Sequence, residues 1–230
     1  MNKKRILIEG FVAASPICLG YLPLGMAFGV LANKAGLNPC EIFLMSVLVF
    51  AGSAQFIAVS MISSGSAILP IILTTFTVNL RHFLMSSSLA IFFKEETKKK
   101  LSLYAYGVTD ESFAINLVRL KQGNWDINRS LVVNHVANFA WIISTVIGGY
   151  GGEFIPEKAF GIDYALIAMF ICLLVFQVKG LKYFIIALIS GIIAVLLSLY
   201  IPGNLYIVLA SVIAATIGVL FFRKTGDSRL

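Results

Sequence analysis

The sequence predicts an all-α, polytopic membrane protein that forms a single transmembrane domain over residues 1–230. Hydrophobic residues make up 59% of the 230 residues and charged residues only 13%, whereas soluble domains average about 45–50% and about 25%. The mean hydropathy is +0.92. The apolar residues form continuous runs, unlike the alternating pattern of transmembrane β-strands. Helices are the remaining way to satisfy backbone hydrogen bonds in lipid.

Eight apolar segments divide the chain, which corresponds to seven or eight spans of about 20 residues each. The first follows a basic start that resembles a signal peptide, but Glu9 interrupts the apolar run and the run continues to Ala32. We therefore expect an uncleaved first span. Trp125 and Trp141 are expected as interface anchors. The segments are residues 11–32, 42–62, 67–93, 101–118, 130–150, 160–178, 181–200 and 204–222.

This composition excludes a cytosolic enzyme, a nucleic-acid-binding domain and a disordered protein, and it leaves no room for a soluble catalytic module. The net charge of +7 would suggest nucleic acid in a soluble protein, but here the basic residues lie mostly in short loops, where they orient the chain. Cys18, Cys40 and Cys172 show no CxxC spacing. No metal site, disulfide framework or cofactor is therefore expected.

The distribution of Lys and Arg predicts that both termini are cytoplasmic. With eight spans and the N-terminus inside, eleven basic residues fall inside and six outside, while Arg81 lies within a span. The loop 94–100 disagrees, because its four lysines would lie outside. The alternative places this loop inside and makes two segments re-entrant. Segment 101–118 would be one of them, since Asp110 and Glu111 lie at its centre.

A weak internal repeat predicts two inverted three-helix units followed by two C-terminal helices. The triplet Ala54-Gln55-Phe56 recurs as Ala137-Asn138-Phe139. A further polar residue follows the amide after 24 residues in one copy (Asn79) and after 25 in the other (Asp163). Because three spans leave the chain on the opposite side of the membrane, the second of two tandem three-span units must be inverted. Transporters of this plan place their substrate site between the repeats. Chance recurrence of the triplet is the alternative.

The first span carries prolines and glycines that predict a broken helix. Pro16 and Pro23 share it with three glycines, among them Gly25. A broken helix frees backbone N–H and C=O groups for a polar substrate, which makes Pro23 and Gly25 candidate substrate-binding residues. The alternative is a kinked packing helix, because Gly and Pro are tolerated in membrane spans.

Two further clusters place polar side chains within spans. Gln55 lies among small residues and can hydrogen-bond across a helix interface. Asn79, Arg81 and His82 lie within a 27-residue segment, where a charge costs about 2.5 kcal/mol or more. Arg81 must meet a counter-ion, water or an anionic substrate group, and its guanidinium suits a carboxylate. The alternatives are a structural ion pair or snorkelling for Arg81, and a structural role for His82.

The fourth cluster contains the adjacent carboxylates Asp110 and Glu111. Neighbouring helical residues point about 100° apart, so the two carboxylates face different partners. One would pair with Arg81 while the other titrates in a proton-coupled carrier. The alternative is a helix start with acidic residues in its first turn. Asn138 shares a helix face with His135 and is expected either to face the same cavity or to bond a neighbouring helix.

Four stretches in series resemble the AzlC-type family, the large subunit of bacterial branched-chain amino acid exporters. The resemblance implies a permease of the inner (plasma) membrane that exports leucine, isoleucine, valine and related hydrophobic amino acids. It also implies export driven by protons and a small, hydrophobic AzlD-like partner subunit. The stretches are Leu19 to Gly29, Phe50 to Phe56, Asn79 to His82 and Thr109 to Glu111.

Three classes of function are weighed. In a carrier, Arg81 or freed N–H groups would take the substrate carboxylate, and Asp110 or Glu111, with Gln55 and Asn79, would take the ammonium group. A membrane-embedded enzyme is disfavoured because the sequence has no GxSxG or HExxH motif. A channel or a non-transporting scaffold subunit of a membrane complex stays open, although single mixed polar residues fit a carrier better than a pore.

Overall fold

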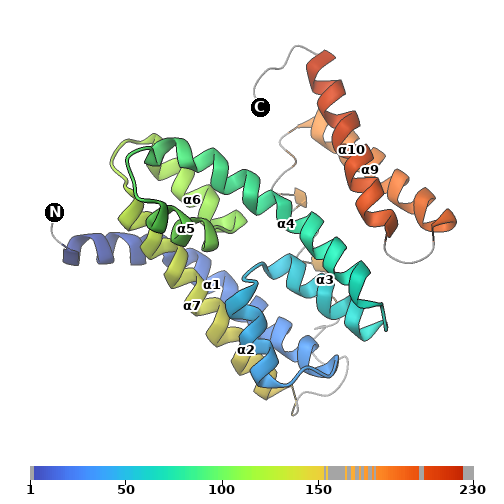
Figure 1. The fold of residues 1–230 in the computed structure, drawn as a ribbon, viewed down its shortest axis with the longest axis horizontal. Coiled ribbons are helices and arrows are strands. Elements are labelled where there is room, and N and C mark those ends of the chain that lie inside the picture. Colours follow the sequence, from blue (N-terminus) through green and yellow to red (C-terminus); the bar gives the residue numbers. More distant parts are fainter. Residues whose placement is uncertain are drawn as a thin grey trace.

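The computed structural model describes residues 3–152, 178, 180–201 and 205–224, with a few isolated positions between 154 and 175. These residues are all-helical, with no strand among them (Figure 1), which confirms the predicted class. The helices are α1 (Lys3–Lys34), α2 (Pro39–Leu48), α3 (Gly52–Ser63), α4 (Ile68–Ala90) extended by the 3-10 turn η1 (Ile91–Phe93), α5 (Lys98–Tyr106), α6 (Asp110–Lys121), α7 (Ile127–Gly151), α9 (Leu181–Tyr200) and α10 (Leu205–Lys224).

Within the described residues, four helices are long and apolar enough to cross a membrane: α1, α4 with η1, α7 and α9. Two of the expected spans differ from this pattern. Segment 42–62 is divided between α2 and α3, and segment 101–118 between α5 and α6. The expected span 160–178 falls largely outside the described residues.

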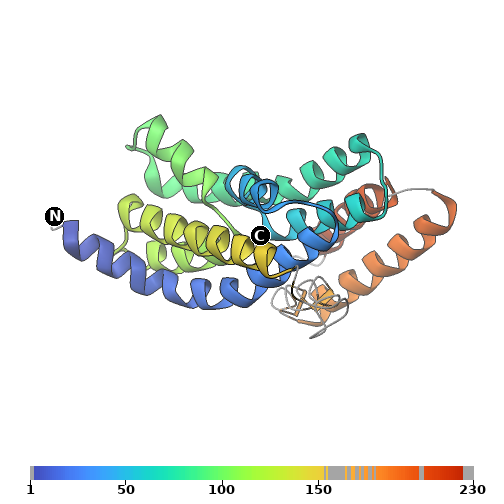
Figure 2. The same ribbon diagram turned by 90° about the horizontal axis from the view of Figure 1, so that it is seen from below.

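Helices α1 and α7 run parallel and pack along their length (Figure 2). At one end Glu9 pairs with Arg129, at 2.5 Å between Oε2 and Nε. At the other end Asn33 lies against Gly152. We call the end of the fold that holds Glu9 and Arg129 the basic end. Glycines bring the two backbones into contact, because a Cβ added at Gly29 would overlap the backbone of α7.

The prediction that the first helix is broken is wrong. α1 continues without interruption through Pro16 and Pro23, and both prolines lie on its exposed face. Pro16 cannot donate to the carbonyl of Val12, but the Ser15 hydroxyl donates to that carbonyl at 2.9 Å. The opposite face of α1 stays packed on α7, with Ile17 buried between the prolines, so the helix holds its direction.

The first break in the fold lies between α2 and α3, at residues 49–51. Phe50 there adopts a φ of +39°, a left-handed conformation that is rare for a bulky residue. The two short helices are joined close to this break, where the Gln55 side chain of α3 donates to the Ser46 hydroxyl of α2 at 3.3 Å. Ser46 in turn bonds Thr145 of α7 at 2.8 Å. Helices α2 and α3 therefore form a hairpin instead of one span.

A second hairpin is formed by α5 and α6, which are broken at residues 107–109. Tyr104 of α5 and Asn116 of α6 would lie about 18 Å apart along one continuous helix. Instead, both meet the same Asn134 side chain of α7, which donates to the Tyr104 carbonyl at 3.1 Å and accepts from Asn116 at 3.0 Å. Both helices therefore lie against α7 around Asn134. Segments 42–62 and 101–118 are thus both divided by a break, as the re-entrant alternative requires.

The two hairpins start from opposite ends of the fold, and their tips meet near its middle. Pro39, at the start of α2, lies beside Gly149 of α7, whereas the far ends of α5 and α6 pack around Ile127 near the basic end. Tyr106 joins the tips, because its hydroxyl donates to the Val47 carbonyl and its ring lies 6.3 Å from that of Phe50.

These hairpins define two units of opposite direction, α1–α3 and α4–α6, each a long helix followed by a hairpin (Figure 1). The unit boundaries differ from those predicted from the triplet repeat. Ala54-Gln55-Phe56 begins a half-helix after a break, whereas Ala137-Asn138-Phe139 lies inside the unbroken α7. The triplets therefore do not occupy equivalent positions.

Helices α9 and α10 pack on each other, and α10 also contacts α4.

Candidate functional site

A small cavity lies where the two hairpin tips meet α1, α4 and α7. Its volume is about 30 Å³, which is room for about one water molecule. All four polar clusters of the sequence contribute to its wall. The lining residues are Tyr21, Leu24, Phe50, Gly52, Ser53, Arg81, His82, Thr109, Asp110, Glu111 and Trp141.

Arg81 of α4 connects the beginnings of both half-helices. Its Nη1 lies 2.9 Å from Oδ2 of Asp110, the first residue of α6, and its Nη2 donates to the Ser53 hydroxyl in the first turn of α3. Its Nε is buried and has no hydrogen-bond partner among the described residues. The charge within the span is thus held by a carboxylate and a hydroxyl, and one N–H remains unused.

Helices α3 and α6 both direct their N-termini at the cavity. The N-terminus of a helix carries a partial positive charge and free N–H groups. Thr109 and Ser112 cap α6 reciprocally, whereas Ala51 provides no side-chain cap for α3. The first turn of α3 therefore has the greater capacity to bind an anionic group.

Glu111 has a different partner from its neighbour Asp110. The Tyr21 hydroxyl of α1 donates to the Glu111 carboxylate, at 2.7 Å from Oε2, and also bonds the Thr109 hydroxyl at 2.9 Å. Tyr21 is itself buried. The two adjacent acids therefore face different sides of the tip of the α5–α6 hairpin, Asp110 toward α4 and Glu111 toward α1.

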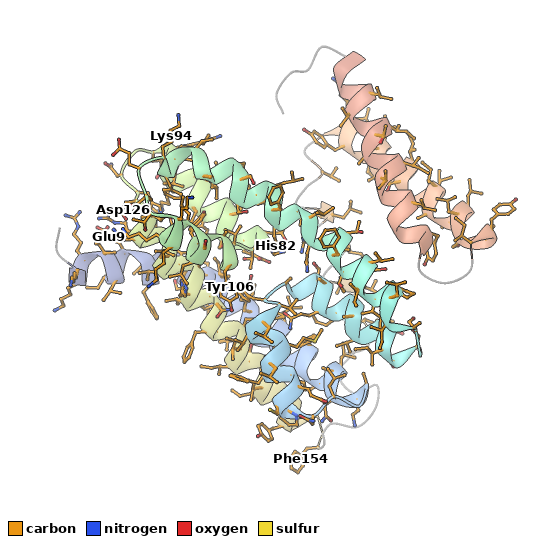
Figure 3. All side chains as sticks on the ribbon, viewed as in Figure 1. Glu9, His82, Lys94, Tyr106, Asp126 and Phe154 are labelled. Atoms are coloured by element: carbon orange, nitrogen blue, oxygen red, sulfur yellow. The ribbon has the colours of Figure 1, made fainter. Side chains whose placement is uncertain are left out.

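His82 fastens α4 to the tip of the α5–α6 hairpin. Its Nδ1 lies 2.7 Å from the Val108 carbonyl, and since a carbonyl only accepts, Nδ1 carries the hydrogen. Nε2 is buried without a partner among the described residues, and so is Oδ1 of Asn79. Figure 3 shows His82 and Tyr106 near the middle of the fold, between the labelled residues of its two ends.

Other expected site residues lie outside this cavity wall. Gln55 is fully buried, accepts from the Trp141 indole at 3.0 Å and from the Ala51 N–H at 3.2 Å, and fixes the α2–α3 hairpin. Pro23 lies on the exposed face of α1, and Gly25 lies against Ser144 of α7.

Asn138 and Asp163 are the remaining residues that the sequence predicts for the site. Asn138 is buried in α7, and its Nδ2 has no partner within the described part of the chain. Asp163 lies outside the described residues.

Sequence reasoning missed three polar residues of the cavity wall and placed Trp141 wrongly. Tyr21, Ser53 and Thr109 lie inside the recognised stretches, but they are not among the predicted site residues. A tyrosine hydroxyl in the middle of an apolar span was the available signal for Tyr21. Trp141 is not an interface anchor, because it is 2% exposed and packs edge-on against Tyr21, with ring centres 5.2 Å apart.

The arrangement brings both signs of charge to one place within the fold. Arg81 and the two helix N-termini are positive, and Asp110 and Glu111 are negative. Leu24, Phe50 and Trp141 add an apolar wall. Such a combination is complementary in charge and polarity to a zwitterion with an apolar side chain.

All residues that line this cavity lie within the stretch that one family model matches. The family model described as AzlC protein matches residues 16–155, which include both hairpins and all of α7. No solved structure matches the chain.

Relatives align over most of the chain. Inner membrane protein YgaZ of Escherichia coli (strain K12) is 31% identical over 162 residues, which cover 69% of this chain and 66% of YgaZ. Branched-chain amino acid transport protein AzlC of Bacillus subtilis (strain 168) is 30% identical over 229 residues, covering 96% of this chain and 87% of that protein. A membrane protein of Helicobacter pylori (strain ATCC 700392 / 26695) is 28% identical over 94% of both chains. The chain therefore belongs to the AzlC family of membrane proteins.

Proposed function

We propose that the protein is a secondary transporter that exports branched-chain amino acids, with its substrate site between the two hairpin tips. The observation that carries this proposal is the convergence of two half-helix N-termini on Arg81 and two carboxylates. Half-helices that end near the middle of the membrane form the substrate sites of many transporters. The similarity to the Bacillus subtilis branched-chain amino acid transport protein supports the class of substrate.

The chemistry of the site suggests how a zwitterion binds. The substrate carboxylate takes the unused Nε of Arg81 and the N–H groups at the start of α3, which have no side-chain cap. Its ammonium group pairs with Glu111, which Tyr21 orients. The branched side chain lies against Phe50 and Trp141. Asp110 keeps Arg81 in place.

Transport requires the hairpins to move, because a leucine does not fit a cavity of about 30 Å³. Helices α1 and α7 are joined by backbone contacts at glycines and form the rigid part. The hairpin tips are joined to α4 by Arg81 and His82. In the proposed cycle, the tips separate toward one end of the fold and then toward the other. Proton coupling uses Glu111, with the free Nε2 of His82 as a second acceptor.

The re-entrant hairpins support a cytoplasmic location for the basic end. Loop 94–100 lies at this end together with Glu9 and Asp126, as the labels of Lys94, Glu9 and Asp126 show in Figure 3. Its lysines thus no longer oppose the positive-inside rule. Within residues 3–152, Lys34 is the basic residue at the opposite end. The basic end carries Lys3, Lys4, Arg5, Lys94, Lys98, Lys99, Lys100, Arg119, Lys121 and Arg129.

The small AzlD-like partner is proposed to pack on α4 and α9. α4 buries only Thr74 and Leu89 among its residues, and α9 buries none. Phe76 and Phe83 of α4 are 63% and 68% exposed. Lipid can cover such faces too, so the partner is tested directly by expressing the chain alone and with the adjacent small gene. Full leucine export by the purified chain alone would refute the requirement for a partner.

Counterflow of labelled leucine in proteoliposomes tests transport itself. Liposomes loaded with unlabelled leucine should accumulate the label, and a proton gradient should change the rate. Unlabelled isoleucine and valine should compete, whereas glutamate should not. Lack of counterflow by the chain with its partner would favour a scaffold subunit, and flux that does not saturate would favour a channel.

A further inference from the structure

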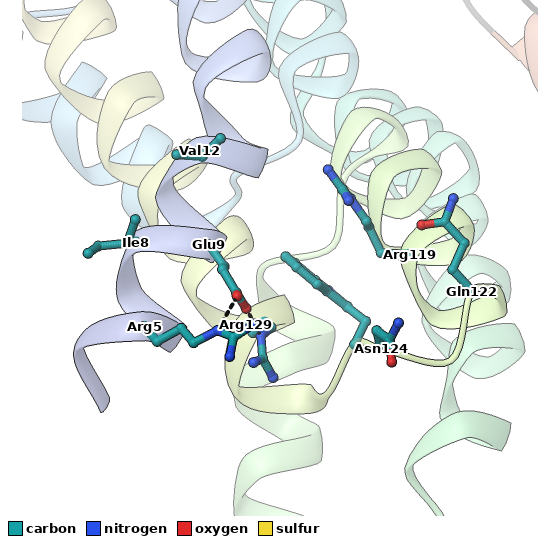
Figure 4. Close-up of a pocket in the computed structure, with 9 residues that line it drawn as sticks. Arg5, Ile8, Glu9, Val12, Arg119, Gln122, Asn124 and Arg129 are labelled. Carbon is teal, nitrogen blue, oxygen red and sulfur yellow. Dashed lines mark hydrogen bonds and ion pairs between the residues drawn. The ribbon is translucent and has the colours of Figure 1, made fainter. Parts of the chain in front are cut away.

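A second, larger cavity opens at the basic end, far from the hairpin tips. Its volume is about 590 Å³, within the range of roughly 300–1,000 Å³ that is usual for ligand pockets. Figure 4 shows Arg5, Ile8, Glu9 and Val12 of α1 on one side and Arg119, Gln122 and Asn124 on the other, with Arg129 between them.

The charges around this cavity leave one positive charge in excess. Glu9 pairs with Arg5, at 2.7 Å, and with Arg129. Asp126 pairs with Arg129 as well, at 3.0 Å. Two guanidinium groups are therefore balanced by two carboxylates. Arg119 lines the same cavity, and no carboxylate of the described residues lies within 4.0 Å of it.

Trp125 holds the guanidinium of Arg119 at the cavity. The Arg119 Cζ lies 5.6 Å from the centre of the indole ring, within the range of a cation–π interaction. The indole is held in place by a hydrogen bond from its Nε1 to Oδ1 of Asn116, at 3.2 Å. The amides of Gln122 and Asn124 line the same wall and add neutral hydrogen-bond donors. This wall therefore fits a singly charged anion that carries further polar oxygens.

An apolar strip leads from the cavity along α1. Ile8 and Val12 both line the cavity and are 54% and 62% exposed. They are four residues apart and share one helix face. A ligand with a polar head in the cavity could lay an acyl chain along this face, toward the middle of the span.

We propose that this cavity binds the headgroup of an anionic phospholipid with a single phosphodiester charge and an uncharged polar end, of which phosphatidylglycerol is the simplest example. Arg119 binds the phosphate, Gln122 and Asn124 bind the glycerol hydroxyls, and an acyl chain follows Ile8 and Val12. The single excess charge of Arg119 matches one phosphodiester. The choline of phosphatidylcholine would bring a second positive charge to a cavity that already holds one.

The test is a titration of the purified full-length protein in detergent micelles, read out by its thermal unfolding midpoint and its tryptophan fluorescence. Phosphatidylglycerol should raise the midpoint and change the fluorescence saturably, whereas phosphatidylcholine should do neither. Arg119→Gln should weaken the apparent affinity about fivefold, the effect expected for one basic residue near a lipid headgroup. Arg119→Lys should recover part of this loss.

Lys121→Gln is the matched control, because Lys121 is exposed on the same helix at the same end but does not line the cavity. It should change the affinity less than twofold. Equal effects of the two charge removals, or equal responses to phosphatidylcholine, would overturn the proposal. Inorganic phosphate separates a lipid from a free anion, and an equal response to phosphate would overturn the lipid assignment. Unchanged unfolding midpoints without lipid would show that both variants fold.

Discussion

The guanidinium of Arg81 in α4 forms an ion pair with the carboxylate of Asp110, the first residue of α6, with Nη1 2.9 Å from Oδ2. The pair joins a long helix to the beginning of a half-helix at the tip of the α5–α6 hairpin. Both side chains are less than one-third exposed. Loss of one partner therefore leaves the other charge largely unpaired within the fold, which costs more than loss of both.

Removal of Arg81 should impair transport even in a variant that still folds. Arg81→Ala leaves Asp110 unpaired and removes the proposed carboxylate ligand, so leucine counterflow should fall about tenfold or more. The double variant Arg81→Gln with Asp110→Asn should recover the yield of folded protein, since neither charge remains, but it should not recover counterflow. Normal counterflow by a stably inserted Arg81→Ala variant would remove Arg81 from the site.

The two adjacent carboxylates should separate in their effects. Asp110→Asn breaks the ion pair with Arg81 and should mainly lower the yield and the unfolding midpoint. Glu111→Gln keeps a hydrogen bond to Tyr21 but loses the charge, so it should preserve the yield and abolish the response of transport to a proton gradient. Similar, mild effects of both variants on yield and on coupling would count against any coupling role here.

Tyr21→Phe tests the contact between α1 and the tip of the α5–α6 hairpin. The variant loses a hydroxyl that bonds Glu111 and Thr109, and its free energy of unfolding should fall by about 1.5–3 kcal/mol, as expected for a hydrogen bond to a charged group. Tyr150→Phe is the control, since Tyr150 is 64% exposed. Equal unfolding midpoints for the two variants would argue that the Tyr21 hydroxyl contributes nothing to stability.

Gly29→Ala should destabilise the protein by disturbing the packing of α1 on α7. A Cβ at Gly29 would overlap the backbone of Thr145 and Gly149, and since neither backbone can yield cheaply, the expected cost is about 1–3 kcal/mol. Gly20→Ala is the matched control in the same helix, because a Cβ there meets no atom within 4 Å. It should leave the unfolding midpoint unchanged or raise it slightly. Reversal of this order would contradict the close packing of α1 on α7.

Cysteine labelling of intact cells tests the re-entrant arrangement. Cys40 is exposed at the end of the fold opposite the basic end and should react with a membrane-impermeant maleimide added from outside. In a chain whose native cysteines are replaced, Glu95→Cys should react only after permeabilisation, because loop 94–100 lies at the basic end. Reaction of Glu95→Cys in intact cells would restore the arrangement with eight full spans.

The sequence by itself determined the class of this protein and the positions of its apolar segments. Long apolar runs without alternation permit only helices in lipid, and this constraint acts locally along the chain. The four polar clusters were also visible in the sequence, because each places costly polar groups within an apolar run. The lysines of loop 94–100 already indicated that a plain succession of eight spans conflicts with the charge distribution.

Only the tertiary structure decided where the helices break and which polar groups meet. Pro16 and Pro23 are strong local signals for a break, but α1 continues through both. It is held straight by its packing on α7, and the Ser15 hydroxyl bonds the carbonyl that Pro16 leaves without a backbone donor. The break between α2 and α3, at residues 49–51, contains no proline or glycine. It depends on the contact between the rings of Phe50 and Tyr106. Likewise, the sequence left open whether Asp110 or Glu111 pairs with Arg81. The choice of Asp110 follows from the fold of α5 and α6 into a hairpin, since only that turn brings the start of α6 beside α4.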